Sequence, residues 1–360
     1  MKHLYVFLFF ILISSITKIN LLFAMNVIPA DDPNIQYYGR WDCSDPKAPT
    51  HSWGGVYILA EFEGTSIGIK VNDNASYFNV FIDDSLISVF HGNKDTLTSY
   101  TLATGLANGN HKILLTKRYE TPNGKYSFDG FVLDDGKKLL HLPQKPKRKI
   151  EFIGNSYTSA EGNEWTEESK APNDSYSNMY KGFGAVVARH YNAQYHLTSR
   201  SGIGLVQDWE GISKFNMPDH FDRTLFCCPE PKWDFSKWIP DLVVICLGLN
   251  DYNGWGGYDH PLKAEIAVLF KQRYRKFIET IMKVYPGSKI LLVAANNVEW
   301  IKQQTSEVAT EENEKGNKNV YYTYFPAYED HFVNEDHPDV VGDKMIAERL
   351  IEKIDTMNVW

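Results

Sequence analysis

The serine at position 156 has a residue type and a position that could support chemistry. It lies in the segment GNSYT, directly after the apolar run IEFI. A serine hydroxyl is a poor nucleophile at neutral pH, so it needs a general base within hydrogen-bond reach and donors for the oxyanion that it creates. Taken alone, this position favours a serine that caps a helix, so the rest of the chain must supply the base and the donors.

Two further loops offer candidate oxyanion donors. Residues 199–204, SRSGIG, follow the possible strand YHLTS, and a glycine there lets a backbone N–H approach a substrate oxygen closely. Gly202 is the first choice and Gly204 the second. Asn250, in GLND, follows the buried run LVVICL, and its side-chain amide can donate to the same oxyanion. Each loop alone is also compatible with an ordinary tight turn.

A histidine near the C-terminus completes the set. His337 lies in NEDHP, and the two acids directly before it can orient an imidazole and stabilise its protonated form. The order serine, glycine, asparagine, histidine along the chain is what makes the set specific. It predicts acyl transfer with Ser156 as nucleophile and His337 as base, and with the Ser156 and Gly202 backbones and the Asn250 amide as oxyanion hole.

A competing hypothesis for the same region is a metal-dependent hydrolase. The segment YEDHFVNEDH holds no pair of histidines at i and i+4 of a helix, and the nearby loops supply no further ligands of recognised spacing. We therefore expect no metal and no other cofactor. The potential ligands of this alternative are Glu329, Asp330, His331, Glu335, Asp336 and His337.

The N-terminal part of the chain is typical of a β-sandwich. The runs GVYILAEFEG, SIGIKV, YFNVFID and HKILLTKR alternate β-branched or aromatic residues with polar ones, and Gly, Asn and Asp punctuate them. We assign an antiparallel sandwich to residues 30–140. The proline-containing, basic segment HLPQKPKRK, residues 141–149, is expected to be a linker.

The hydrophobic pattern of the sequence changes after this segment. The runs IEFIG, LVVICLG and KILLVAAN are continuously apolar, as parallel strands buried on both faces require. Apolar residues in steps of three and four predict helices over residues 264–285 and 340–354. We assign an α/β domain to residues 150–360, with its ligand site at the carboxyl ends of the strands.

The first 24 residues, MKHLYVFLFFILISSITKINLLFA, are typical of a secretory signal peptide. An uncleaved membrane anchor is the alternative, because the apolar character continues to Ala24. We expect a secreted or periplasmic protein with no membrane association after cleavage. Removing Lys2 and Lys18 with this segment takes the formal charge from −8 to −10, which argues against nucleic acid as a partner. Free thiols are favoured over disulfides for Cys43, Cys227, Cys228 and Cys246.

The ordered segments GNSYT, SGIG, GLND and DHP resemble the four blocks of the SGNH hydrolases, also called the GDSL esterase superfamily. The stretches GRWDCSDPKAPTHSWGGVYILAEFEGTSIGIKV, YFNVFIDD, MPDHFDRTL and PKWDFSKWIPDLVVICLGLND resemble carbohydrate esterase family 2. The resemblance implies an N-terminal jelly-roll β-sandwich and an α/β SGNH-hydrolase domain with a flavodoxin-like, three-layer fold. It also implies a serine esterase that deacetylates plant cell-wall polysaccharides such as xylan and glucomannan. Acetylated polysaccharide or oligosaccharide is then the expected partner.

Two departures from the family pattern concern the acids. Asn155 stands where the superfamily usually has aspartate, a position that is structural in role. Many members carry an aspartate three residues before the histidine, where this chain has Asn334, whereas some family 2 esterases use an acid two residues before it. Others work as a dyad, with a backbone carbonyl holding the histidine. We rank Glu335 first as the acid, Asp336 second, and a dyad third.

Substrate contacts are predicted from aromatic residues near the strand ends. Trp255 and Trp300 could form a platform for a sugar ring, although ordinary packing accounts for them equally well. Tyr157, beside the nucleophile, is a candidate for lining the acyl pocket. The non-enzymatic alternative is a carbohydrate-binding protein with a vestigial esterase site, but a decayed site would not require all four block residues.

Overall fold

The computed structural model describes residues 26–170, 173–295, 298–332 and 336–360. The predicted signal peptide, residues 1–24, lies outside the described residues. Across these ranges, no helix combines the length and the apolar character needed to cross a bilayer.

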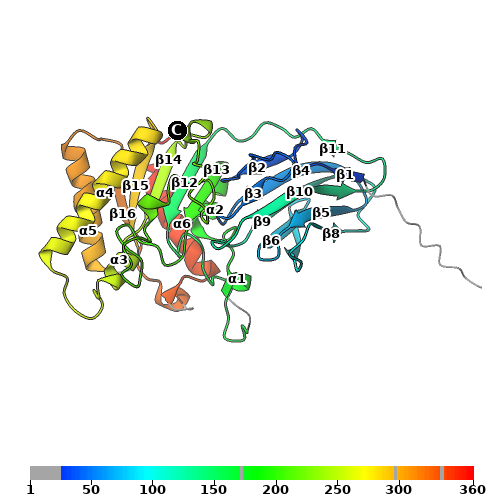
Figure 1. Cartoon of the computed structure of the whole chain (residues 1–360). Helices are drawn as coiled ribbons and strands as arrows, with labels where there is room; N and C mark the ends of the chain where they lie inside the picture. The colour runs from blue at the N-terminus through cyan, green and yellow to red at the C-terminus, as the bar shows by residue number, and fades with distance from the viewer. Residues whose placement is uncertain (1–25, 171–172, 296–297, 333–335) are drawn as a thin grey trace, which may run out of the picture.

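The N-terminal part folds into two antiparallel sheets (Figure 1). The first has the order β1 (Asn26–Ile28), β10 (Tyr126–Leu133), β5 (Ile67–Asn72) and β8 (Thr98–Ala103), with β3 (Thr50–His51) paired to β10. The second has the order β11 (Leu139–Leu140), β4 (Tyr57–Gly64), β9 (Gly109–Lys117), β6 (Tyr77–Ile82) and β7 (Ser85–His91), with β2 (Gln36–Tyr38) paired to β4.

Alternation along the strands explains why the two sheets pack against each other. In β4, the buried residues Ile58, Ala60 and Phe62 alternate with partly exposed ones. They share one core with Ile69 and Phe131 from the opposite sheet. Burying a large apolar side chain contributes about 1.5–3 kcal/mol, so this shared core holds the sandwich together.

The rest of the chain forms a three-layer α/β unit. Its five parallel strands have the order β13 (Gln194–Ser199), β12 (Lys149–Gly154), β14 (Leu242–Cys246), β15 (Lys289–Ala294) and β16 (Val320–Tyr324). Helices α2 (Phe183–His190) and α6 (Val340–Asp355) cover one face, and α4 (Ala264–Val284) and α5 (Glu299–Glu314) cover the other (Figure 1). The short helices are α1 (Asn173–Tyr176), α3 (Leu249–Gly254) and three 3-10 turns at Met217–Asp219, Phe235–Lys237 and Glu329–His331.

The apolar runs of the sequence became the inner strands of this sheet. IEFIG lies in β12, LVVIC in β14 and KILLVA in β15, and the two helical stripes lie in α4 and α6. Every residue of β14 is buried, because helices cover both of its faces. Residues 141–148, between β11 and β12, belong to no helix or strand.

The sandwich is bonded to the α/β unit through buried charges. The Arg40 guanidinium donates to the Glu151 carboxylate of β12 at 2.9 Å, and both side chains are buried. The Thr198 hydroxyl of β13 donates to the same carboxylate oxygen at 2.6 Å. A buried carboxylate needs such partners to offset its lost hydration, so the junction between the two units is specific.

Candidate active site

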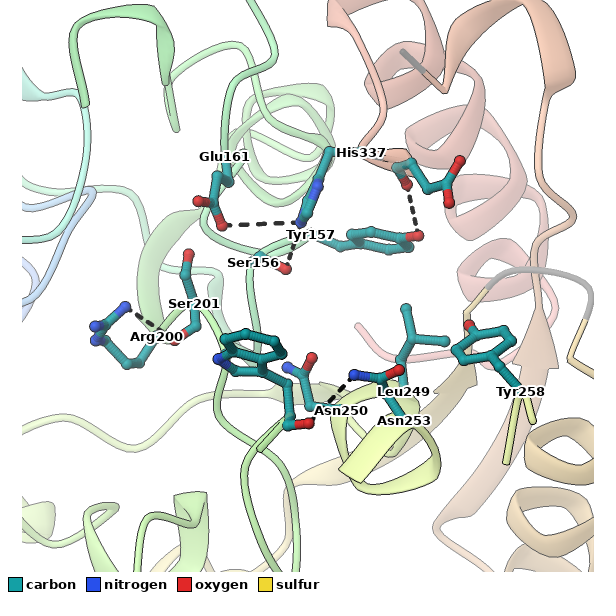
Figure 2. Close-up of a pocket in the computed structure, with 13 residues that line it drawn as sticks. Ser156, Tyr157, Glu161, Arg200, Ser201, Leu249, Asn250, Asn253, Tyr258 and His337 are labelled. Carbon is teal, nitrogen blue, oxygen red and sulfur yellow. Dashed lines mark hydrogen bonds and ion pairs between the residues drawn. The ribbon is translucent and has the colours of Figure 1, made fainter. Parts of the chain in front are cut away.

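The Ser156 hydroxyl lies 2.7 Å from His337 Nε2, although 181 positions separate the two residues in the chain. Ser156 follows the last residues of β12, and His337 lies just before α6. Figure 2 shows the two side chains pointing toward one another. Ser156 is 7% exposed, so its hydroxyl is sheltered but reachable. This is the geometry that a serine nucleophile and its general base require.

A pocket of about 610 Å³ opens at this serine. Gly202 and Asn250, the predicted oxyanion donors, line it together with Ser156 and His337. Gly202, Asn250 and Ser156 follow β13, β14 and β12 in that order. These are neighbouring strands whose carboxyl ends lie at one edge of the sheet. The structure therefore brings all four predicted residues to one cavity.

Gly202 is in the left-handed backbone region, with φ of +79°. A Cβ at this position would lie 2.9 Å from Cδ1 of Trp209. Both facts require glycine in this loop. Gly204, the second choice as donor, is not part of the pocket lining. A Cβ there would lie 2.0 Å from the Gln207 carbonyl oxygen, so packing explains this glycine.

Asp251 shapes the loop behind the predicted oxyanion hole. Its buried carboxylate accepts hydrogen bonds from the backbone N–H groups of Leu205, Val206 and Gln207 at 2.8, 2.6 and 3.1 Å. Burial raises the pKa of Asp251 to about 6, and the three N–H donors oppose that rise. The neighbouring Asn250 amide donates to the Ile203 carbonyl at 2.8 Å, which leaves its second N–H for the pocket.

Tyr157 joins the loop of the nucleophile to the loop of the base. Its hydroxyl donates to the Asp336 carbonyl oxygen at 2.8 Å, and its ring meets the His337 ring edge-on at 5.3 Å (Figure 2). Tyr157 is one of the residues around the pocket, but its side chain is buried. Its position is therefore that of a support for His337, in addition to the predicted role at the acyl pocket.

Of the two candidate acids of the predicted triad, the structure describes only Asp336. Glu335, the first choice, lies outside the described residues. Asp336 is an exposed residue with φ of +60°, and its backbone carbonyl, not its carboxylate, takes the bond from Tyr157. The positive φ is one that aspartate tolerates better than most residues.

A carboxylate that the sequence did not indicate lies beside the base. Oε2 of Glu161 is 3.8 Å from His337 Nε2 (Figure 2). Burial raises the pKa of Glu161, Glu120 raises it further, and His337 and Arg200 oppose the rise. No sequence motif marks Glu161, the fifth residue after the nucleophile, because only the turn after β12 brings it back to the site.

The two predicted tryptophan contacts lie elsewhere. Trp255 and Trp300 are partly buried and pack against Phe270 of α4, at 6.4 and 5.2 Å between ring centroids. The packing interpretation therefore holds for both, and neither lines the pocket. Its exposed aromatic walls are Trp209, 53% exposed, and Tyr258, 58% exposed.

The two histidines of the metal hypothesis have other partners, His337 with Ser156 and His331 with Asp339. His331 Nδ1 lies 3.1 Å from the Asp339 carboxylate, which also caps α6 by accepting from the Gly342 N–H. Within the described part of the chain, no three histidine, cysteine, aspartate or glutamate side chains gather as metal ligands would.

The comparisons with known proteins agree with this arrangement. A family model of the carbohydrate esterase 2 N-terminal region matches residues 37–143. A cellulase/esterase of Acetivibrio thermocellus is 32% identical over 338 residues, which cover 92% of this chain and 40% of the relative. The chain thus spans about two fifths of the length of that relative.

Two shorter proteins match over most of their length. An acetylxylan esterase / glucomannan deacetylase of Cellvibrio japonicus is 28% identical over 319 residues, 86% of each chain. The solved structure of a family two carbohydrate esterase from Clostridium thermocellum, in complex with cellohexaose, is 30% identical with a TM-score of 0.81. It covers 89% of this chain and 98% of that one. The family resemblance is thereby confirmed, and the chain belongs to carbohydrate esterase family 2.

Proposed function

We propose that this protein is a serine esterase that removes O-acetyl groups from plant cell-wall polysaccharide such as xylan or glucomannan. The observation that carries the proposal is the 2.7 Å contact between Ser156 and His337 in the lining of an open pocket. Family membership and the names of the relatives support the substrate class.

The proposed reaction has two acyl-transfer steps. For Nε2 of His337 to act as base, the ring proton must be on Nδ1. Nε2 takes the Ser156 proton while Oγ attacks the acetyl carbonyl carbon, and the same proton then goes to the departing sugar oxygen. In the second step His337 deprotonates a water molecule that attacks the acetyl carbonyl carbon, and it then returns the proton to Ser156 Oγ as the bond to the acetyl group breaks and acetate leaves.

The oxyanion forms once in each step. The N–H groups of Ser156 and Gly202 and the Asn250 amide are the proposed donors, and the pocket shields them partly from water. Fixed donors of this kind stabilise the tetrahedral intermediate without reorganising during the reaction.

The exposed walls of the pocket suit a polysaccharide. Trp209 and Tyr258 present aromatic faces on which the apolar face of a sugar ring can stack. The pocket is open, so a chain can extend beyond the acetylated residue.

Acetate release from acetylated xylan and acetylated glucomannan tests this function. Wild-type protein should release acetate from at least one of them, and Ser156→Ala should release essentially none. Glycan binding without acetate release would support a carbohydrate-binding protein instead. Glu335→Gln and Asp336→Asn, assayed in parallel, distinguish a triad from a dyad. If one of these residues is the acid of a triad, its substitution should lower kcat by about 100-fold or more.

We propose further that the sandwich is a jelly roll and that the protein is exported. The sheet orders β1-β10-β5-β8 and β4-β9-β6-β7 support the first point, because a jelly roll pairs two four-stranded sheets in this interleaved manner. Export fits a substrate outside the cell, and fractionation of a producing culture tests it.

A further inference from the structure

The loop between β9 and β10, residues 118–125, carries two sandwich residues into the α/β unit. The Tyr119 hydroxyl lies 2.6 Å from the Ser201 hydroxyl. Glu120 is 3% exposed, and its carboxylate lies among the loops that follow β12 and β13. Both loops also carry the predicted catalytic residues.

Each carboxylate oxygen of Glu120 bonds to a different one of these two loops. Oε1 accepts from the Ser201 N–H at 2.9 Å and from the Arg200 guanidinium at 2.6 Å. Oε2 accepts from the Ser159 hydroxyl at 2.8 Å, three residues after the nucleophile. Arg200 and Ser201 directly precede Gly202, so Glu120 holds the backbone just before the proposed oxyanion donor.

The loop that presents Glu120 is itself anchored in the sandwich. The Arg118 N–H donates to the Tyr77 carbonyl at 2.8 Å, and the Thr121 N–H donates to the Ser52 carbonyl at 3.0 Å. The sandwich therefore fixes the backbone on both sides of Glu120. Because the Glu120 carboxylate bonds to the loop at Gly202, the position of the sandwich affects the position of that loop.

A second contact from the sandwich reaches the same loop. The Tyr119 and Ser201 hydroxyls lie 2.6 Å apart, and Ser201 and Glu161 both line the pocket. Glu161 in turn lies 3.8 Å from His337 Nε2.

We propose that Glu120 is a positioning residue of the active site, so that the sandwich is part of the catalytic apparatus. The inference rests on the proposed esterase function. A buried carboxylate with three donors costs free energy unless all of them are in place, which fixes the geometry of the loops that it joins. Removing it frees the Ser201–Gly202 segment to shift, and a displacement of about 1 Å at such a site lowers turnover by about 100-fold.

Steady-state hydrolysis of 4-nitrophenyl acetate by purified full-length variants tests the proposal. Glu120→Ala should lower kcat by about 100-fold while KM changes less than about threefold. Glu120→Gln keeps a carbonyl acceptor for the Ser201 N–H and can donate to Ser159, so it should lose only about tenfold. The affinity of a boronic acid that adds to Ser156 should fall in parallel with kcat, because its tetrahedral adduct needs the same donors.

A matched control separates positioning from general loosening of the junction. Glu151 is also a buried carboxylate that bonds to a sandwich arginine, Arg40, but it lies in the middle of the sheet. Glu151→Gln should lower the thermal midpoint and leave kcat unchanged. Equal loss of kcat in the Glu120 and Glu151 variants would overturn the proposal, and so would wild-type kcat in Glu120→Ala.

The outcomes also separate this inference from the function on which it rests. If Glu120→Ala does not fold, Glu120→Gln decides, and wild-type kcat in that variant overturns the inference. If Ser156→Ala keeps wild-type activity, the proposed function itself fails, whatever the Glu120 variants do.

Discussion

The Glu161 carboxylate lies 3.8 Å from His337 Nε2, the nitrogen that also bonds the Ser156 hydroxyl at 2.7 Å. When this nitrogen takes the proton of the serine, the imidazole becomes a cation. A partly buried carboxylate at this distance stabilises the cation, because water screens the pair only partly. Glu161 therefore approaches the base from the side of the reaction, whereas the acid of a conventional triad bonds to the other ring nitrogen.

Replacing this carboxylate should change the pH dependence of the reaction. In Glu161→Gln the positive charge on the imidazole loses a stabilising partner, so the acid limb of the kcat/KM profile should move to lower pH. Turnover at neutral pH should fall by about threefold to tenfold, because the cation forms in the transition state. Glu210→Gln, at an exposed glutamate, should leave the profile unchanged. A Glu161→Gln profile that matches the wild type would show that the two groups do not interact.

The Asn250 amide should contribute through its donor hydrogens. Asn250→Ala and the isosteric Asn250→Asp both lack the amide donor, so each should lower kcat for an aryl acetate by about 100- to 1000-fold. Both variants should fold, because the bond lost in the resting protein is one contact to the Ile203 carbonyl. Steady-state kinetics and circular dichroism check the two statements, and high turnover in Asn250→Asp would contradict the role as a donor.

The parts of the fold that could be predicted are those with a strong local pattern. Burial on both faces makes β14 entirely apolar and β12 and β15 mostly apolar, and one-sided burial of α4 produces a clear stripe. Strand β16 lies at the edge of the sheet and is only partly buried, so its sequence VYYTY carries a weaker signal.

The candidate site divides in the same way. Ser156, Gly202, Asn250 and His337 lie in short segments whose residue types and order carry the chemistry. Glu161, Trp209 and Glu120 are brought in by turns and by the docking of the sandwich, and no local pattern reports such contacts. Proximity to a strand end also misplaced Trp255 and Trp300, since their side chains pack between α3, α4 and α5.

Trp209 should bind sugar, and Trp300 should not. Trp209→Ala should raise KM for an acetylated xylo-oligosaccharide by about threefold to tenfold, since an aromatic contact contributes about 0.5–1.5 kcal/mol. Trp209→Tyr keeps an aromatic face and should recover most of the affinity. Because Trp209 lies beside Gly202, 4-nitrophenyl acetate serves as the reference substrate for any shift of that loop.

Trp300→Ala is the matching test for the packing role. The substitution removes a ring that packs against Phe270, so the free energy of unfolding should fall by about 3 kcal/mol. The KM for the oligosaccharide should stay unchanged. Urea denaturation measures the first quantity. A raised KM in Trp300→Ala would restore the platform that the sequence predicted.

Asp343 of α6 should make stability fall as pH rises. Its buried carboxyl accepts from the Asn163 amide and the Phe183 N–H, at 2.9 and 3.0 Å. Burial raises its pKa from 3.8 to about 8, which those two donors oppose and Asp339 reinforces. Between these values the folded protein binds a proton that the unfolded chain releases, so the stabilisation is complete below about pH 4 and is lost as pH rises through about 8.

The Asp343→Asn variant isolates this effect. It cannot titrate, so its free energy of unfolding should fall less than that of the wild type between about pH 6.5 and about pH 8.5. This interval lies above the pKa of about 6 for Asp251, which contributes to the wild-type slope at lower pH. The absolute stability of the variant should also drop, because its amide places a donor opposite a donor, so the slope and not the level is decisive. Urea denaturation at several pH values measures that slope, with Asp45→Asn as an exposed control. Equal slopes for Asp343→Asn and the wild type would mean that Asp343 is ionised throughout this range.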